Sequence, residues 1–238
     1  MNHTEIKLSI VIPVYNEQEI LKTEVENIIA EAETFLQSTD YEIVLVENGS
    51  TDKTAAIANE LASRYPQIHL VSLKVALYGG ALKAGVLKSG GTYIAVFNID
   101  FWDMDAVKKA FALFEKNEYD IVVCSKSMQG AQDLRPFSRR ILNRTFNFAL
   151  RVFFRYPGTD THGIKIFNRE KAAPVFNQCK TNRDLLDTEF LVRANRAGLK
   201  IKEIPVICEE KRKSVYGIFR HIPRIIKDFI IIFADIYF

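Results

Sequence analysis

Polar side chains that carry oxygen atoms follow an apolar run in the middle of the chain. The run Thr92-Tyr-Ile-Ala-Val-Phe ends in Asn98-Ile-Asp100, and Asp103 and Asp105 come directly after it. Carboxylate and amide oxygens bind divalent cations such as Mg²⁺, and a bound cation can hold the phosphates of a ligand. The same residue types also suit another role, because Asn98 and Asp103 are favoured caps for a following helix. These residues alone leave both roles open.

Two other polar clusters, Tyr15-Asn16-Glu17 and Glu47-Asn48-Gly49-Ser50, also follow apolar runs. Parallel strands bring their carboxyl ends to one edge of a sheet, where ligands of open α/β folds bind. Carboxylates there can contact a base, ribose hydroxyls, or a cation that bridges a diphosphate. Neither a P-loop lysine motif nor a G-x-G-x-x-G follows the first strand, which argues against nucleotide triphosphatases and dinucleotide dehydrogenases.

Apolar periodicity predicts the elements that position these clusters. Short β-branched runs alternate with segments of helical spacing through the first half, which favours a three-layer α/β fold with a mainly parallel sheet. We expect strands at 8–14, 41–46, 68–73, 92–98 and 121–124, and helices at 17–36, 81–88, 105–114 and one ending near residue 65 that Ser50 or Thr51 caps. In the second half we expect helices at 137–154 and 185–197 and strands at 163–167 and 200–208.

The pattern of apolar and basic residues in the last segment of the chain predicts an amphipathic helix. Within Gly217–Phe238, apolar residues recur at helical spacing, whereas Arg220, Arg224 and Lys227 lie on another face. Such a helix suits a membrane surface, with its cations near the headgroups. It equally suits packing on the body of the protein or on a partner subunit. We therefore divide the chain into one domain, 1–215, and a helical extension, 216–238.

Composition and charge are those of an ordinary globular protein, with 238 residues, 48% hydrophobic and 26% charged residues, and a net charge of +3. Nothing in the overall charge indicates that the protein binds nucleic acid. Between residues 134 and 159, however, there are six arginines and no acid, which suits a phosphate or a lipid headgroup. Three widely spaced cysteines, Cys124, Cys179 and Cys208, indicate buried thiols in a reducing compartment. We see no signal peptide and no membrane-spanning segment.

Short motifs follow one another along the chain in a defined order. They are Ile10-Val-Ile-Pro-Val-Tyr-Asn-Glu17, Val44-Leu-Val-Glu-Asn-Gly-Ser-Thr-Asp52, Gly79-Gly-Ala81, Asn98-Ile-Asp100, Asp160-Thr-His-Gly-Ile-Lys165, Thr188-Glu189, Glu203-Ile-Pro-Val206 and Lys211-Arg-Lys-Ser214. In this order the motifs resemble those of the family 2 glycosyltransferases of GT-A fold, over about residues 8–215. The motifs of the second half resemble the branch that contains dolichol-phosphate mannose synthase and bacterial polyprenyl-phosphate glycosyltransferases.

The resemblance implies roles for particular residues. Asp100 and Asn98 would hold Mg²⁺ or Mn²⁺ on the donor diphosphate, and Lys126, Arg139 and Arg144 would receive the phosphate of an acceptor lipid. The nucleotide-sugar would contact Pro13, Tyr15, Glu17, Glu47, Gly80, Asn98, Asp100, Arg212 and Lys213. The catalytic set it implies is Asp100, Arg139, Arg212 and Glu189.

The implied reaction is the inverting transfer of a sugar from a UDP- or GDP-linked donor to a polyprenyl phosphate. We expect it at the cytoplasmic face of a membrane, with the protein peripheral to the bilayer and a membrane partner subunit among its partners. A phosphate acceptor needs no general base, whereas a glycan hydroxyl would need one, and Asp187 or Glu189 would then serve. Departures from the family pattern, such as Asn98 in place of the first acid of D-x-D, keep a third alternative open, a catalytically silent subunit that binds a nucleotide-sugar.

Overall fold

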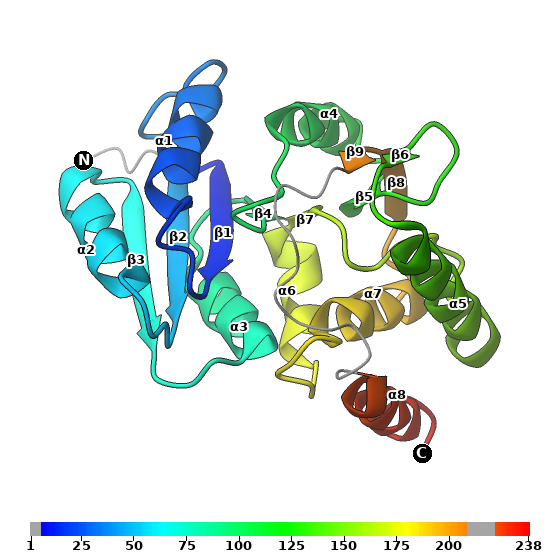
Figure 1. Cartoon of the computed structure of the whole chain (residues 1–238). Coiled ribbons are helices and arrows are strands. Elements are labelled where there is room, and N and C mark those ends of the chain that lie inside the picture. Colours follow the sequence, from blue (N-terminus) through cyan, green and yellow to red (C-terminus); the bar gives the residue numbers. More distant parts are fainter. Residues whose placement is uncertain (1–5, 209–221) are drawn as a thin grey trace.

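A seven-stranded sheet with helices on both faces forms the body of the protein (Figure 1). The computed structural model describes residues 6–208 and 222–238. The strand order is β3-β2-β1-β4-β7-β5-β8. The strands of this sheet are β1 (Leu8–Val14), β2 (Tyr41–Asn48), β3 (Ile68–Leu73), β4 (Tyr93–Val96), β5 (Ile121–Ser125), β7 (Lys165–Asn168) and β8 (Ile201–Pro205). The helices are α1 (Leu21–Ala32), α2 (Thr54–Arg64), α3 (Tyr78–Lys88), α4 (Met104–Glu115), α5 (Phe137–Phe154), α6 (Arg169–Asn177), α7 (Leu186–Arg196) and α8 (Ile222–Tyr237).

Side chains that alternate along each strand divide the core into two layers. Ile10 and Ile12 of β1 pack in the cluster that contains the buried faces of α1, α2 and α4. Val11, between them, packs in the cluster that contains α3, α6 and α7. This alternation is the two-residue period of a strand, and burial on both faces explains why central strands such as β1 are mostly apolar. The predicted three-layer α/β architecture is confirmed.

Most strand pairs are parallel, as expected, but β7 runs antiparallel to both of its neighbours, β4 and β5. Its insertion places the loop before β7 at the carboxyl ends of β4 and β5. The expected strand at 200–208 is divided, because β8 belongs to the main sheet whereas β9 (Ile207–Cys208) pairs with β6 (Gln132–Asp133). Neither β6 nor α6 was expected. All three cysteines are buried and free of disulfides.

The predicted cap of α2 was wrong. The helix begins at Thr54, and the carboxylate of Asp52 accepts from the backbone N–H of Thr54 at 2.9 Å. Ser50 is used elsewhere, because its hydroxyl accepts from the backbone N–H of Asn16 at 3.1 Å. The backbone N–H of Thr51 donates to the side chain of Asn16 at 2.8 Å. These side chains thus join the loops after β1 and β2 instead of ending a helix.

One face of α8 packs on the protein body. Ile232 is buried in the core cluster that α7 also enters, and Asp235 forms an ion pair with Arg193 of α7. Phe229 packs edge-on against Phe154 of α5, with ring centroids 4.9 Å apart. Packing on the body, one of the two expectations for this helix, is therefore found. In the described parts of the chain, no helix is both long and apolar enough to cross a bilayer.

Gly163 lies in the loop just before β7, and its substitution tests how tightly this loop is packed. A Cβ atom at this position would overlap the carbonyl oxygen of Cys124 in β5. We expect Gly163→Ala to lower the free energy of unfolding by about 1–3 kcal/mol, because overpacking forces backbone shifts. Urea denaturation measures the change.

Gly90→Ala is the matched control, since the nearest atom to its added Cβ lies at 3.6 Å. If both variants unfold at the same urea concentration, the loop at Gly163 is looser than described.

Candidate active site

A cavity of about 420 Å³ lies at the carboxyl ends of β1, β2 and β4, where the three polar clusters meet. We name it the strand-end cavity. It is lined by Pro13, Val14, Tyr15, Glu17, Asn48, Ala76, Tyr78, Asn98, Ile99, Asp100 and Asp184. Pro13, Tyr15, Glu17, Asn98 and Asp100 were expected to bind one ligand, and the fold does bring them together.

Hydrogen bonds between neighbouring loops hold the wall that Tyr15 and Glu17 form. Asn16 has a left-handed backbone, with φ of 56°, which turns the chain sharply after β1. The backbone N–H of Glu17 donates to the hydroxyl of Thr54 at 2.7 Å. The turn therefore aims Tyr15 and Glu17 into the cavity, while Asn16 faces the neighbouring loop.

Two residues expected at this site do not line it. Glu47 is buried, and its carboxylate accepts from the backbone N–H of Ser50 at 2.6 Å, so it shapes the loop after β2. The backbone N–H of Gly80 donates to the carbonyl of Asn182 at 3.1 Å, which ties α3 to the segment before α7. This placement does not support contact of either residue with a nucleotide.

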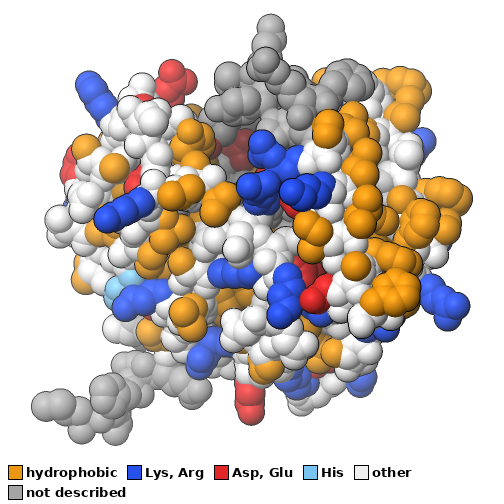
Figure 2. All heavy atoms as spheres, turned by 90° about the horizontal axis from the view of Figure 1, so that it is seen from below, with side chains coloured by type: hydrophobic (Ala, Val, Ile, Leu, Met, Phe, Trp, Pro, Cys, Tyr) orange, Lys and Arg blue, Asp and Glu red, His pale blue; other side chains and the backbone are white. Residues whose placement is uncertain are grey.

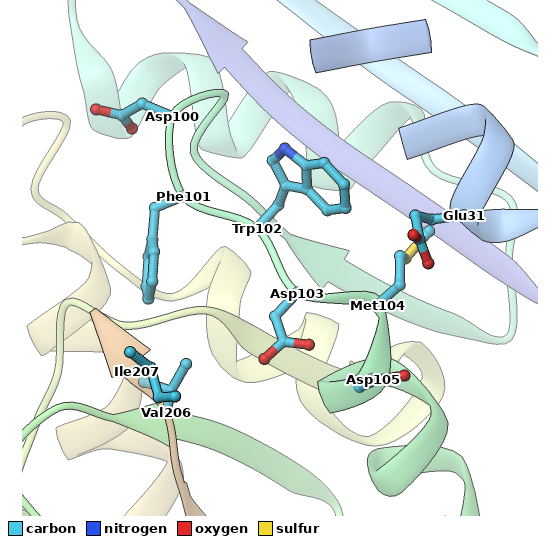
Figure 3. A pocket seen from close by; sticks show the side chains of 9 residues that line it. All are labelled: Glu31, Asp100, Phe101, Trp102, Asp103, Met104, Asp105, Val206 and Ile207. Atoms are coloured by element: carbon cyan, nitrogen blue, oxygen red, sulfur yellow. The ribbon is translucent and has the colours of Figure 1, made fainter. Parts of the chain in front are cut away.

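Asp100 also borders a second cavity, of about 390 Å³, whose other acids are Glu31, Asp103 and Asp105 (Figure 3). Asp103 caps α4 by accepting from the backbone N–H of Ala106 at 2.9 Å, so the capping role is confirmed for this residue. In Figure 3 the carboxylate of Asp100 points away from Asp103 and Asp105. Asp100 is therefore the acid of this loop that also reaches the strand-end cavity.

The residues around Asp100 fit a divalent cation that arrives with a ligand. Among the described residues, no three histidine, cysteine or acidic side chains gather to form a cation site. Asp100 offers one carboxylate, and Asn98 lines the same cavity with an amide. Mg²⁺ commonly takes one or two carboxylates from a protein and its other ligands from phosphates and water. This donor set suits a cation shared with a diphosphate.

A groove of about 580 Å³ lies between α5 and α8 and combines cations with an apolar wall. Its polar end contains Lys126, Arg135, Arg139 and His162. The apolar wall contains Leu142, Phe146, Ala149, Leu185, Ile222, Ile225, Ile226 and Phe229. Arg144, expected beside Lys126 and Arg139, is exposed and lies outside this groove. Arg212 and Lys213 lie outside the described residues.

A buried ion pair fixes the polar end of the groove. The ammonium of Lys126 lies 2.8 Å from the carboxylate of Asp160, and both side chains are almost fully buried. Burial is the largest single influence and would raise the pKa of Asp160, but the charge and hydrogen bond of Lys126 together with the contacts to His162 lower this pKa to about 2. The backbone N–H of His162 donates to the same carboxylate at 3.0 Å. Burial lowers the pKa of His162, so this ring is neutral at pH 7.

The two acids expected as general bases are both held by protein groups. Glu189 has no exposed surface, and its carboxylate accepts from the backbone N–H groups of Lys180 and Thr181, each at 2.8 Å, and from Arg193. Such a carboxylate cannot reach a substrate, so the expected catalytic role of Glu189 is not supported.

Asp187 is equally committed. Its carboxylate lies 3.1 Å from the ammonium of Lys165 and accepts from the hydroxyl of Tyr78 at 3.0 Å. Burial, and then the Asp187 charge, raise the pKa of Tyr78 well above its ordinary value, so the hydroxyl keeps its proton. The pair therefore orients the ring of Tyr78, which lines the strand-end cavity.

Asp184 is the residue that lines both the strand-end cavity and the groove. It therefore lies where the strand-end cavity meets the apolar groove. The sequence reasoning missed Asp184 and Tyr78, because neither lies at the end of a predicted strand. Arg135 was also missed as a site residue, although it belongs to the arginine-rich run.

The chain is similar to several proteins of known sequence or structure. Glycosyltransferase AglD of Haloferax volcanii is 31% identical over 220 residues, which are 91% of this chain and 35% of that protein. The dolichyl-phosphate beta-glucosyltransferase of Dictyostelium discoideum is 31% identical over 84% of this chain. The chain spans about a third of the first relative's length and about two thirds (66%) of the second's.

The fold also matches that of the mannosyltransferase PcManGT from Pyrobaculum calidifontis, whose structure contains GDP-Man and Mn²⁺. The TM-score is 0.64 at 19% identity, over 93% of this chain and 64% of that one. This likeness agrees with the expected GT-A fold. Residues 9–175 match the sequence profile of glycosyl transferase family 2. That match covers more than half of the sequence, and the chain therefore belongs to glycosyl transferase family 2.

Proposed function

We propose that the protein transfers a sugar from a nucleotide-sugar to a polyprenyl phosphate. The observation that carries the proposal is the groove between α5 and α8, which offers cations at one end and an apolar wall along its length. A phosphate joined to a long hydrocarbon has this same division. The groove meets the strand-end cavity at Asp184, so the phosphate of one substrate would lie beside the sugar of the other.

The relatives support this choice of acceptor. Several are dolichyl-phosphate beta-glucosyltransferases, from Dictyostelium discoideum among others. A dolichyl phosphate joins an anionic phosphate to a long hydrocarbon. The groove offers cations to the phosphate and an apolar wall to the hydrocarbon. The relatives do not decide the sugar, because the mannosyltransferase of similar fold binds GDP-Man.

The chain's own residues would carry most of the reaction. Pro13, Tyr15 and Glu17 would hold the nucleotide, and a cation on Asp100 would neutralise charge on the departing diphosphate. Lys126 and Arg139 would orient the acceptor phosphate for an in-line attack at the anomeric carbon, with inversion. The phosphate is already ionised at neutral pH, which agrees with the absence of an uncommitted base at Asp187 or Glu189.

The groove also opens onto an apolar surface that suits a membrane. Leu142 and Ile226 belong to the groove wall and are 39% and 54% exposed. Hydrophobic side chains gather on the side of the molecule that α5 and α8 form (Figure 2). The exposed ones include Ile141, Phe148, Val152 and Phe153 of α5 and Ile230 and Ile231 of α8. We name this set, with Leu142 and Ile226, the α5–α8 surface.

Cations accompany the α5–α8 surface. Arg140, Arg144, Arg151 and Arg155 are exposed on or just after α5, and Arg224 and Lys227 are exposed on α8. Apolar side chains flanked by arginine and lysine are typical of segments that lie in the headgroup region of anionic membranes. We propose that this surface rests on the cytoplasmic face of a membrane, from which the acceptor lipid enters the groove.

The first experiment combines the purified protein with UDP- and GDP-sugars and a short polyprenyl phosphate, with Mn²⁺ or with EDTA. We expect one donor to release its nucleoside diphosphate only when the lipid and Mn²⁺ are present, with formation of a lipid-linked sugar. Binding of a donor without release on any acceptor would instead indicate a silent subunit.

Arg139 and Arg144 offer a matched pair for the acceptor site, because both lie on α5 but only Arg139 lines the groove. We expect Arg139→Gln to raise the KM for polyprenyl phosphate about 10- to 100-fold, as loss of a hydrogen bond to a charged group would. The KM for the donor should stay unchanged. Arg144→Gln should change either KM less than about threefold, as expected of an exposed charge screened by solvent. Equal effects of the two variants would show that the acceptor phosphate binds elsewhere.

Asp100 and Asp105 offer a similar pair for the cation. We expect Mn²⁺ to increase the affinity for the nucleoside diphosphate, and Asp100→Asn to remove at least about tenfold of this increase, because the cation would lose its carboxylate ligand. Titration calorimetry with Mn²⁺ and with EDTA measures both. Asp105→Asn changes an exposed acid of α4 and should leave the Mn²⁺ effect intact. An intact Mn²⁺ effect in Asp100→Asn would rule out this ligand.

Acidic substitutions on the α5–α8 surface test its contact with a membrane. Deletion of α8 is unsuitable, because α8 packs on the core and its loss would expose apolar side chains. We expect the double variant Phe148→Asp with Ile230→Asp to lose most co-sedimentation with anionic phosphatidylglycerol vesicles and to keep the wild-type melting temperature. Leu87→Asp is the control, because Leu87 is 79% exposed on α3, outside this surface. Unchanged sedimentation of the double variant would contradict membrane contact here.

A further inference from the structure

Three acids precede or begin α7, and only one of them faces the two cavities. Glu189 lies in the interior, and Asp187 is held by Lys165 and Tyr78. Asp184 is partly exposed, and within the described chain no hydrogen bond or ion pair holds its carboxylate. A carboxylate with no partner among residues 6–208 and 222–238, at the junction of the two cavities, is available to a substrate.

The backbone around Asp184 is held in place from two sides. Glu189 accepts from the backbone N–H groups of Lys180 and Thr181, which fixes the segment from within α7. The ammonium of Lys83 on α3 donates to the carbonyl of Cys179 and to the side chain of Asn182, each at 2.7 Å. A segment tied down in this way presents Asp184 in a defined position, as a group that selects a substrate must be presented.

Chemistry decides which substrate part the carboxylate suits. An acid repels the phosphate of an acceptor and the diphosphate of a donor. It accepts hydrogen bonds well from hydroxyl groups, and bonds to a charged acceptor are stronger than neutral ones. The sugar is the part of a nucleotide-sugar that offers hydroxyls, and in the proposed reaction it lies between diphosphate and acceptor. Asp184 occupies that same junction.

We propose that Asp184 binds hydroxyl groups of the donor sugar and so helps to determine which sugar is transferred. This inference rests on the proposed function, whose cavities it assigns to donor and acceptor. Tyr78 lines the same cavity near Asp184, whose charge contributes to the raised pKa of Tyr78. With its proton committed to Asp187, the Tyr78 oxygen retains a lone pair that can accept from a sugar hydroxyl. The two residues would contact the sugar from one side.

The test compares the intact chain with Asp184→Asn and Asp184→Ala, by titration calorimetry with UDP, GDP and sugar nucleotides that differ at single hydroxyls. We expect both variants to bind the preferred sugar nucleotide about tenfold more weakly, a change of about 1.4 kcal/mol. Affinity for the nucleoside diphosphate alone should stay within about twofold. The difference in affinity between the glucose, galactose and mannose forms of the sugar nucleotide should become smaller in both variants.

Glu118→Gln is the control, because Glu118 is exposed in the loop between α4 and β5, away from both cavities. In steady-state assays, Asp184→Asn should raise the KM for the donor and leave that for polyprenyl phosphate unchanged. A fall in kcat with normal donor affinity would overturn the inference and assign Asp184 as a base. Equal weakening of nucleotide and nucleotide-sugar, or no weakening, would also overturn it.

The outcomes separate this inference from the proposed function. Wild-type protein that binds no nucleotide, or transfers no sugar to the lipid, defeats the proposed function and the inference with it. Wild-type protein that transfers sugar, together with an Asp184→Asn variant of unchanged sugar preference, defeats the inference alone.

Discussion

The buried ion pair between Lys126 and Asp160 is the interaction on which the site depends. It joins the end of β5 to the loop before β7, and the same carboxylate also accepts from the backbone N–H groups of Lys126 and His162. Removing one partner of such a pair typically costs about 3–5 kcal/mol, because the other charge stays buried. The pair is therefore a constraint on folding, and it holds the ammonium of Lys126 at the groove. Since β7 lies between β4 and β5, the pair helps to hold this loop against the strand ends.

Acids in this protein divide into those that position other groups and those that face substrate cavities. Asp160, Asp187 and Glu189 are buried and bonded to lysines, arginines or backbone N–H groups. Their charges are compensated inside the protein, so they fix loops and rings. Asp100 and Asp184 border the cavities instead. The division would allow a region rich in carboxylates to receive the diphosphate and phosphate of the proposed reaction, because the charges of these three acids are already compensated.

The sequence predicted the first half of the fold well, because apolar strands such as β1 and β2 and the order of the motifs carry strong local signals. It also brought Tyr15, Glu17 and Asp100 to one sheet edge by parallel topology alone. The sequence reasoning failed where the direction of a side chain depends on residues that are distant in the sequence. Nothing local distinguishes Glu47, which turns to the N–H of Ser50, from a side chain that faces the cavity. The burial of Glu189 and the position of Arg144 outside the groove were not foreseen for the same reason, since burial and the side of a helix depend on tertiary packing. Nothing in the sequence marked Asp184 as a site residue, because a single acid in a loop is compatible with many roles.

The opening of the groove onto the α5–α8 surface has a kinetic consequence. Leu142 and Ile226 belong to both, so a lipid held in a bilayer could enter sideways, with its hydrocarbon never passing through water. Its encounter with the enzyme is then a two-dimensional search, and the rate follows the mole fraction of the acceptor in the membrane. Dilution of the acceptor with inert lipid would slow turnover at constant bulk concentration. On the proposed function, the donor would arrive from solution through the strand-end cavity and obey ordinary bulk kinetics, so the two substrates would saturate the same enzyme on different concentration scales.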